Sequence, residues 1–165
     1  MKKIVYLFFI FLFACGETQW EEVKINDQYL ILLPDYLEKT SRIKPEASLQ
    51  YENNRKQTFI IVMDERKSSL DKIKSLQDYF KLVAEEYCLL DKQLKKLEVD
   101  EKKIQGANAI YYEYTMHPKE VPTRFIGAII EGKEYFYHVV AWTKESGFEN
   151  YGDDLRKAVV SLREI

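Results

Sequence analysis

Apolar and polar residues alternate in short stretches along most of the chain, which is the pattern of strands with one buried face. The stretch 57–65 is instead apolar at consecutive positions, as in a strand that is buried on both faces. A weaker strand is expected near 97–102. The other segments with a strand pattern are 20–25, 28–34, 47–52, 107–116, 124–131 and 134–142.

Two segments repeat their apolar residues at helical spacing. In the first, expected over residues 75–91, these residues are Leu76, Phe80, Val83, Tyr87, Leu90 and Leu94. In the second, which ends the chain, they are Phe148, Tyr151, Leu155, Val159 and Leu162. Ser75 with Asp78, and Ser146 with Glu149, have the spacing of a capping box, so we expect the two helices to begin at these serines.

Short connections between strands predict a largely antiparallel sheet, and strands that are apolar on both faces predict a layer on each side of it. The expected fold class is therefore α+β, an α/β/α sandwich around one central sheet. Within this sheet, residues 132–133 suit a two-residue type II′ turn. Such a turn would pair Glu131 with Glu134 and would place His138 opposite Gly127.

The first residues have the layout of a secretory signal. Lys2 and Lys3 precede an apolar run over 4–13, which is far shorter than the roughly 20 residues that span a bilayer. The stretch 12–15, Leu-Phe-Ala-Cys, resembles the lipobox of bacterial lipoproteins. In that family the cysteine sulfur is joined to diacylglycerol and the chain is cut before the cysteine.

We therefore expect a signal peptide over 1–14, a covalent lipid on Cys15, a tether over 15–19 and one domain over 20–165. The protein would lie in the bacterial cell envelope, held to a membrane by its lipid, with the inner and the outer membrane both open. The alternative is an ordinary secreted protein with a cysteine at this position. No cofactor other than the lipid is expected.

Composition narrows the possible partners. The chain of 165 residues has 25 basic and 27 acidic residues, and cleavage before Cys15 would remove two of the basic ones. Because the charge balance is slightly acidic, it argues against a nucleic-acid partner. Cys88 would be the other thiol of the mature chain, so no internal disulfide between two free cysteines is expected and the fold depends on its core.

Four stretches together carry a resemblance to a known family. They are YLILLPDYLEK, ASLQYENNRKQTFIIVMDE, SLQDYFKLVAEEY, and IQGANAIYYEYTM with RFIGAIIEGKEYFYHVVAWTKESGFENYGDDLRKAVVSL. Their order and spacing resemble the PsbP-like superfamily, which includes the extrinsic photosystem II subunit PsbP and small bacterial envelope lipoproteins. Tyr36 departs from a tryptophan that members often carry, and Ser161-Leu162 departs from their usual serine-phenylalanine ending. The resemblance implies an α/β/α sandwich and a non-enzymatic binding or assembly role.

His138 is a candidate ligand contact, because a glycine opposite it would leave space beside the imidazole. The other histidine, His117, completes no metal-binding motif, so no metal site is expected. Tyr111 and Tyr137 belong to a band of tyrosines that suits either a core or an interface.

Glu113 is in phase with Tyr111 and could pair with Arg124 or Lys119. A catalytic role would need a second group within reach, and the sequence offers none. It also contains no nucleophile elbow and no phosphate-binding loop. We therefore expect no enzymatic activity.

Two functions are considered ahead of a third, a hydrolase or transferase. The first is a lipoprotein whose domain binds an unidentified protein partner or helps an envelope complex assemble. Its contact would be the loop 117–123, where Lys119 and Glu120 supply polar contacts beside two prolines. The alternative is a carrier of a small molecule or metal on the sheet face around His138. A pocket lined by His138, Glu113 and tyrosine hydroxyls would favour the carrier, whereas a filled core would favour the binding domain.

Overall fold

A computed structural model describes residues 18–86 and 95–165 of the chain. The expected signal peptide, Cys15, Cys88 and the last five residues of the first expected helix lie outside these ranges. The strands are β1 Trp20–Ile25, β2 Tyr29–Pro34, β3 Glu38–Lys39, β4 Leu49–Asn53, β5 Thr58–Arg66, β6 Lys95–Ile104, β7 Ala107–Met116, β8 Thr123–Glu131, β9 Tyr135–Lys144 and β10 Arg163–Glu164. The helices are α1 Leu76–Glu86 and α2 Phe148–Val159, with short 3-10 turns η1 Lys67–Ser69, η2 Pro118–Glu120 and η3 Glu145–Gly147.

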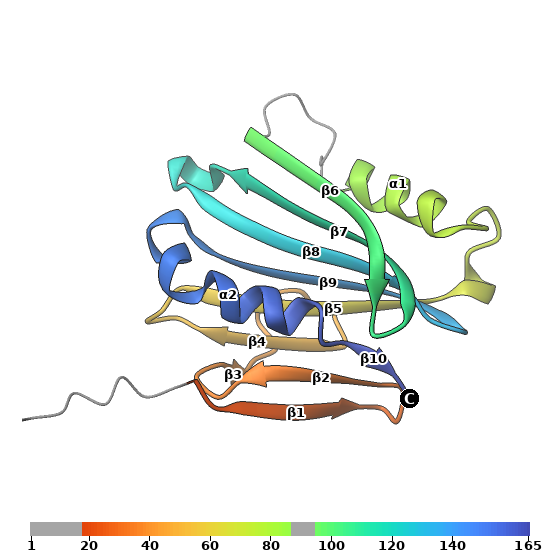
Figure 1. Cartoon of the computed structure of the whole chain (residues 1–165), viewed down its shortest axis with the longest axis horizontal. Helices are drawn as coiled ribbons and strands as arrows, with labels where there is room; N and C mark the ends of the chain where they lie inside the picture. Colours follow the sequence, from red (N-terminus) through yellow and green to blue (C-terminus); the bar gives the residue numbers. More distant parts are fainter. Residues whose placement is uncertain (1–17, 87–94) are drawn as a thin grey trace, which may run out of the picture.

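Seven of the described strands form one antiparallel sheet in the order β3-β4-β5-β9-β8-β7-β6 (Figure 1). This confirms the predicted α+β class. The prediction of a single sheet was wrong, because β1, β2 and β10 form a separate three-stranded sheet. The segment 20–34 folds back on itself as a hairpin, and the chain's last strand adds to its edge through Arg163 and Leu30.

Each face of the large sheet has its own core. On one face, α2 and the small sheet pack together through Leu155, Val159 and Ile31 against strand residues such as Val139. On the other face, α1 packs through Leu76, Tyr79, Val83 and Ala84 on residues of β7, β8 and β9. Figure 1 shows the two helices on opposite sides of the strands. Layers on both faces are what the doubly apolar strands predict.

The two predicted capping boxes had different outcomes. The Ser75 hydroxyl accepts a hydrogen bond from the Asp78 backbone N–H at 3.1 Å and donates to the Asp78 carboxylate at 2.8 Å, so α1 begins as expected. The prediction for Ser146 was wrong. This serine lies in η3, and α2 begins at Phe148 after Gly147, which makes no side-chain cap bond.

In the hairpin between β8 and β9, each residue of β8 pairs with the residue of β9 that lies two positions after the predicted one. The Gly132 N–H donates to the Tyr135 carbonyl at 2.9 Å, so Lys133 and Glu134 are the central turn residues. His138 therefore lies opposite Ile129 and not opposite Gly127. Gly132 is therefore not a central residue of the turn. A side chain at this position would crowd Glu164, because a Cβ there would lie 2.6 Å from the Glu164 carboxylate.

The weakly predicted strand near 97–102 is a ten-residue edge strand, β6, which pairs with β7. Its weak sequence signal follows from its position, since the side chains from Glu98 to Glu101 are exposed. A strand at the edge of a sheet is held largely by backbone pairing on one side and can remain polar.

Candidate docking site

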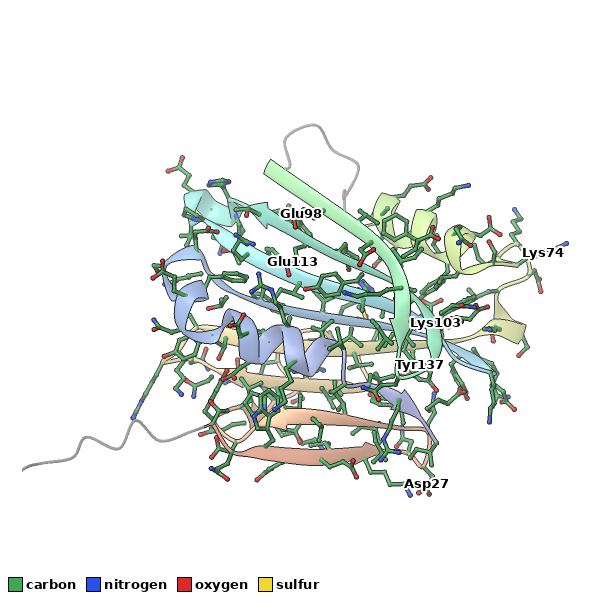
Figure 2. All side chains as sticks on the ribbon, viewed as in Figure 1. Asp27, Lys74, Glu98, Lys103, Glu113 and Tyr137 are labelled. Carbon is green, nitrogen blue, oxygen red and sulfur yellow. The ribbon has the colours of Figure 1, made fainter. Side chains whose placement is uncertain are left out.

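The structure separates the predicted site residues onto the two faces of the sheet. Glu113, Tyr111 and Tyr137 face α2 and the small sheet, whereas His138 lies on the face that α1 covers. Figure 2 shows Glu113 beside α2 and Tyr137 near the opposite end of the sheet, where its hydroxyl donates to Glu164 of β10 at 3.1 Å. No single cavity of the described residues can therefore combine His138 with Glu113, so the pocket that would have favoured the carrier alternative is not formed there.

Glu113 joins α2 to the sheet. Arg156 of α2 donates two hydrogen bonds to its carboxylate, at 2.7 and 3.0 Å, and the predicted partner Arg124 donates one at 3.1 Å. Tyr111 donates a further bond. Burial alone would raise the pKa of Glu113, but the bonds from Arg156 and Tyr111 lower it below its usual range. A carboxylate with all these donors is an ionised structural anchor.

His138 is part of a filled core. Its side chain is 1% exposed, and its Nε2 atom is hydrogen-bonded to the Tyr112 hydroxyl. Gly127 makes this contact possible, because a Cβ there would lie 2.1 Å from the Tyr112 ring. Burial, with a smaller effect of the Lys44 charge, lowers the pKa of His138 to about 3. The space that the sequence indicated near a glycine is thus occupied by the ring of a neighbouring strand.

The tyrosine band also divides between the faces. Tyr112 and Tyr114 are buried in the core under α1, and Tyr137 is buried in the core under α2. Tyr111 and Tyr135 are half-buried at the edge of the core under α2. The band is therefore mostly core, with hydroxyls that bond to Glu113, Glu164 and Arg66.

A different aromatic cluster is accessible. Phe59, Trp142 and Phe125 come from the adjacent strands β5, β9 and β8 and are each partly exposed. Phe59 stacks on Trp142 with ring centroids 5.2 Å apart, and Trp142 stacks on Phe125 at 5.9 Å. Phe125 in turn stacks on buried Tyr114 at 4.9 Å. We call Phe59, Phe125 and Trp142 the aromatic shelf.

The loop between β7 and β8 forms one wall of a cavity of about 260 Å³ over this shelf. Pro118, Lys119 and Val121 line it, and Val121 is 39% exposed. This is the loop in which the sequence placed a partner contact. Glu120, which was predicted to join Lys119 there, does not line the cavity.

The loop is held in an unusual backbone conformation. Lys119 and Glu120 have φ angles of 52° and 66°, in the left-handed region that costs a non-glycine residue about 1 kcal/mol or more. Backbone bonds hold this conformation, from Glu120 N–H to the His117 carbonyl at 3.1 Å and from Val121 N–H to the Pro118 carbonyl at 3.1 Å. Strain of this kind is often retained where a loop must present particular side chains.

Phe59, Phe125 and Trp142 were not among the residues singled out from the sequence. Each is an ordinary aromatic residue near a strand end, and no local pattern distinguishes it. Their common feature is the strand order β5-β9-β8, which brings the three rings into one row. The predicted hairpin did not reveal the pair, because its register would have placed Phe125 opposite Val140, whereas the observed register places it opposite Trp142.

Two other features, a metal cluster and a membrane-spanning helix, are not found in the described part of the chain. Within residues 18–86 and 95–165, no group of three or more His, Cys, Asp or Glu side chains could hold a metal ion. The helices in those same ranges are too short or too polar to cross a membrane. The aromatic shelf with its loop is the candidate site because it combines partly exposed stacked rings with a strained loop around one cavity.

The fold is PsbP-like. The solution structure of cyanobacterial PsbP (CyanoP) from Synechocystis sp. PCC 6803 is similar with a TM-score of 0.65 and 10% sequence identity, over 92% of this chain and 96% of that one. A structure from Bacteroides thetaiotaomicron VPI-5482 is similar with a TM-score of 0.53 and 7% identity, over 83% of this chain and 45% of that one. No protein-family model and no curated protein sequence matches the chain. At these identities the likeness concerns the fold.

Proposed function

We propose that this protein is a membrane-anchored lipoprotein of the bacterial envelope whose PsbP-like domain binds another protein, without catalysis, through the aromatic shelf. The observation that carries the proposal is the row of stacked rings left partly exposed beside a strained loop. Aromatic residues are enriched where proteins bind one another, because they supply a large contact area with few rotatable bonds.

The size of the cavity supports a protein partner over a small ligand. A volume of about 260 Å³ lies below the roughly 300–1,000 Å³ of pockets that enclose drug-sized ligands. It is suited to one or two side chains that a larger partner inserts. The carrier alternative lacks the combined pocket that would have favoured it, since His138 and Glu113 lie on opposite faces. His138 instead lines a separate cavity of about 410 Å³, together with Lys44 and Tyr79.

The position of the shelf suits a lipid-anchored protein. In Figure 1 the connection between β7 and β8 lies at the same end of the molecule as the start of β1. Thr18 also donates a hydrogen bond to Asp154 of α2 at 3.0 Å, so the described chain is fixed within three residues of Cys15. Three extended residues span only about 10 Å. A lipid on Cys15 would thus hold this end of the domain, with the connection between β7 and β8, near the membrane, where a membrane-associated partner could reach it.

The proposal is tested by affinity capture from detergent-solubilised membranes with the tagged full-length protein. Trp142→Ala should reduce the yield of specifically captured partner at least about tenfold, since buried aromatic residues dominate interface energy. Tyr135→Ala is the matched control, because Tyr135 is a partly exposed aromatic residue at the other end of β9.

A second pair of variants controls for a folding defect in Trp142→Ala. Val121→Ser removes an apolar contact from the shelf, and Val99→Ser makes the same change at a comparably accessible valine on β6, since the two residues are 39% and 46% exposed. We expect unchanged thermal melting for both and reduced capture for Val121→Ser alone. Equal capture by Val121→Ser, Trp142→Ala and the unaltered protein would rule out the shelf as the docking surface.

A further inference from the structure

We propose that the aromatic shelf selects a partner segment in which carboxylates flank an apolar side chain, with the rings holding the apolar group and Lys119 and Lys144 pairing with the carboxylates. This inference rests on the proposed docking function and adds the chemistry of the partner. It follows from the charges around the cavity, from the electrostatics of the rings and from the rigidity of the loop.

The charged side chains that line the cavity are both basic. They are Lys119, from the loop, and Lys144, from the end of β9. Neither forms an ion pair with another residue of the ranges 18–86 and 95–165, and both are exposed. Glu145, the acidic neighbour of Lys144 along the chain, is paired with Arg124. The cavity therefore has a positive rim.

The rings decide where each part of a ligand can bind. The face of an aromatic ring carries partial negative charge, so it repels a carboxylate and accepts an apolar side chain. A cation could bind over a ring face, but the two lysines at the rim would repel it. The stable arrangement puts the apolar group on Trp142 and its neighbours and the carboxylates at the rim.

The backbone on which Lys119 is mounted is ordered before a ligand arrives. Pro118 and Pro122 restrict the backbone on either side of Lys119. The Glu145 N–H donates to the Pro122 carbonyl at 2.9 Å, and the Thr123 hydroxyl donates to the Val121 carbonyl at 3.2 Å. A loop that is already ordered costs less entropy on binding, so a modest charge pair at the rim contributes measurably to selectivity.

The test uses the full-length protein and fluorescein-labelled peptides in fluorescence anisotropy. The first peptide has the core Phe-Asp-Phe-Glu between Gly-Ser spacers, the second has lysine in place of both acidic residues, and the third has alanine in place of both phenylalanines. We expect the first to bind roughly tenfold more tightly than the second, by a preference that added salt diminishes. The third should bind weakly, because it has nothing to place on the rings.

Charge reversal then assigns the preference to this site. Lys119→Glu with Lys144→Glu should abolish or invert the preference, whereas Lys72→Glu with Lys133→Glu, which alters two exposed lysines elsewhere, should preserve it. Equal affinity for the acidic and basic peptides would overturn the inference, and so would an acidic preference that survives reversal of Lys119 and Lys144.

Two further outcomes distinguish failure of the partner chemistry from failure of protein docking itself. If Trp142→Ala loses the partner in membrane capture but no peptide shows a charge preference, the shelf docks a protein of different chemistry and only the inference fails. If the protein binds phosphatidylglycerol vesicles through Lys119, Lys144 and Trp142 but none of the peptides, the shelf contacts a lipid surface and the inference is overturned.

Discussion

At the scale of single residues, packing decides the chemistry of His138. The imidazole is buried under α1, its Nε2 atom is bonded to the Tyr112 hydroxyl, and Gly127 leaves the room in which the Tyr112 ring lies. Because burial penalises the charged form, the pKa of His138 falls to about 3, with a smaller contribution from Lys44. The residue is thus a neutral core group at physiological pH.

This state makes stability depend on pH. An unfolded histidine has a pKa near 6.5, so between about pH 6.5 and 3 the unfolded chain binds a proton that folded His138 does not. Stability must then fall as pH drops, by about 2 kcal/mol between pH 7 and pH 5 from this residue. His138→Gln should reduce the pH dependence by that amount in urea unfolding at the two pH values. The same pH dependence in both proteins would show that His138 can be protonated in the fold.

At the scale of elements, α2 is held by one apolar stripe and one charged contact. Leu155 and Val159 are fully buried against the large sheet and the small sheet, as the helical spacing predicts, and so is Ala158, which the prediction did not include. On its flank, Arg156 binds Glu113 and also lies over the Phe148 ring, 4.8 Å from its centre. The stripe provides the buried apolar contact, and Arg156 links the helix to Glu113 of β7.

Leu155→Ala should lower the free energy of unfolding by about 2–5 kcal/mol, because it leaves a cavity at a position with no exposed surface. Asn150→Ala, at an exposed position of the same helix, should change it by less than about 0.5 kcal/mol. Denaturant unfolding of the two variants measures both values. A small effect at Leu155 would mean that α2 packs through another face.

At the scale of the whole molecule, the start of β1 and the connection between β7 and β8 lie at one end, while the β8–β9 hairpin and β10 lie at the other (Figure 1). Under the proposed anchoring, the first end faces the membrane and the second faces away from it. The fold thus gives the two ends different surroundings, and a docking surface at the tether end can meet only partners that come close to the membrane.

The anchor is tested at Cys15. Cys15→Ser should abolish lipid attachment and leave uncleaved precursor or unanchored protein, because serine lacks the thiol that accepts diacylglycerol. Metabolic labelling with a fatty-acid probe detects the lipid. Cys88→Ser is the control and should keep the label. Label that persists on the Cys15→Ser protein would refute the lipoprotein assignment.

The sequence by itself determined what depends on neighbours along the chain. Alternation predicted most strands, and the Ser75–Asp78 pair predicted where α1 begins. Helical spacing predicted the buried residues Leu76 and Val83 of α1 and Leu155 and Val159 of α2. It also predicted that Glu113 could pair with Arg124, since the two residues lie close to a common chain reversal. These features involve residues within a few turns or one hairpin, so periodicity and turn chemistry suffice to read them.

The tertiary structure decided what depends on segments that are distant in the sequence. Only strand order brings Phe59 of β5 beside Trp142 and Phe125, and only the paired register shows that His138 and Glu113 face different layers. Likewise, Ser146 has the spacing of a cap, yet the 3-10 turn before α2 makes Gly147 the capping position. The physical reason is that the alternation of apolar and polar residues along a strand indicates which residues share a face. It does not indicate which other strand lies beside that strand. That choice is made by burial of whole layers, to which every segment contributes at once.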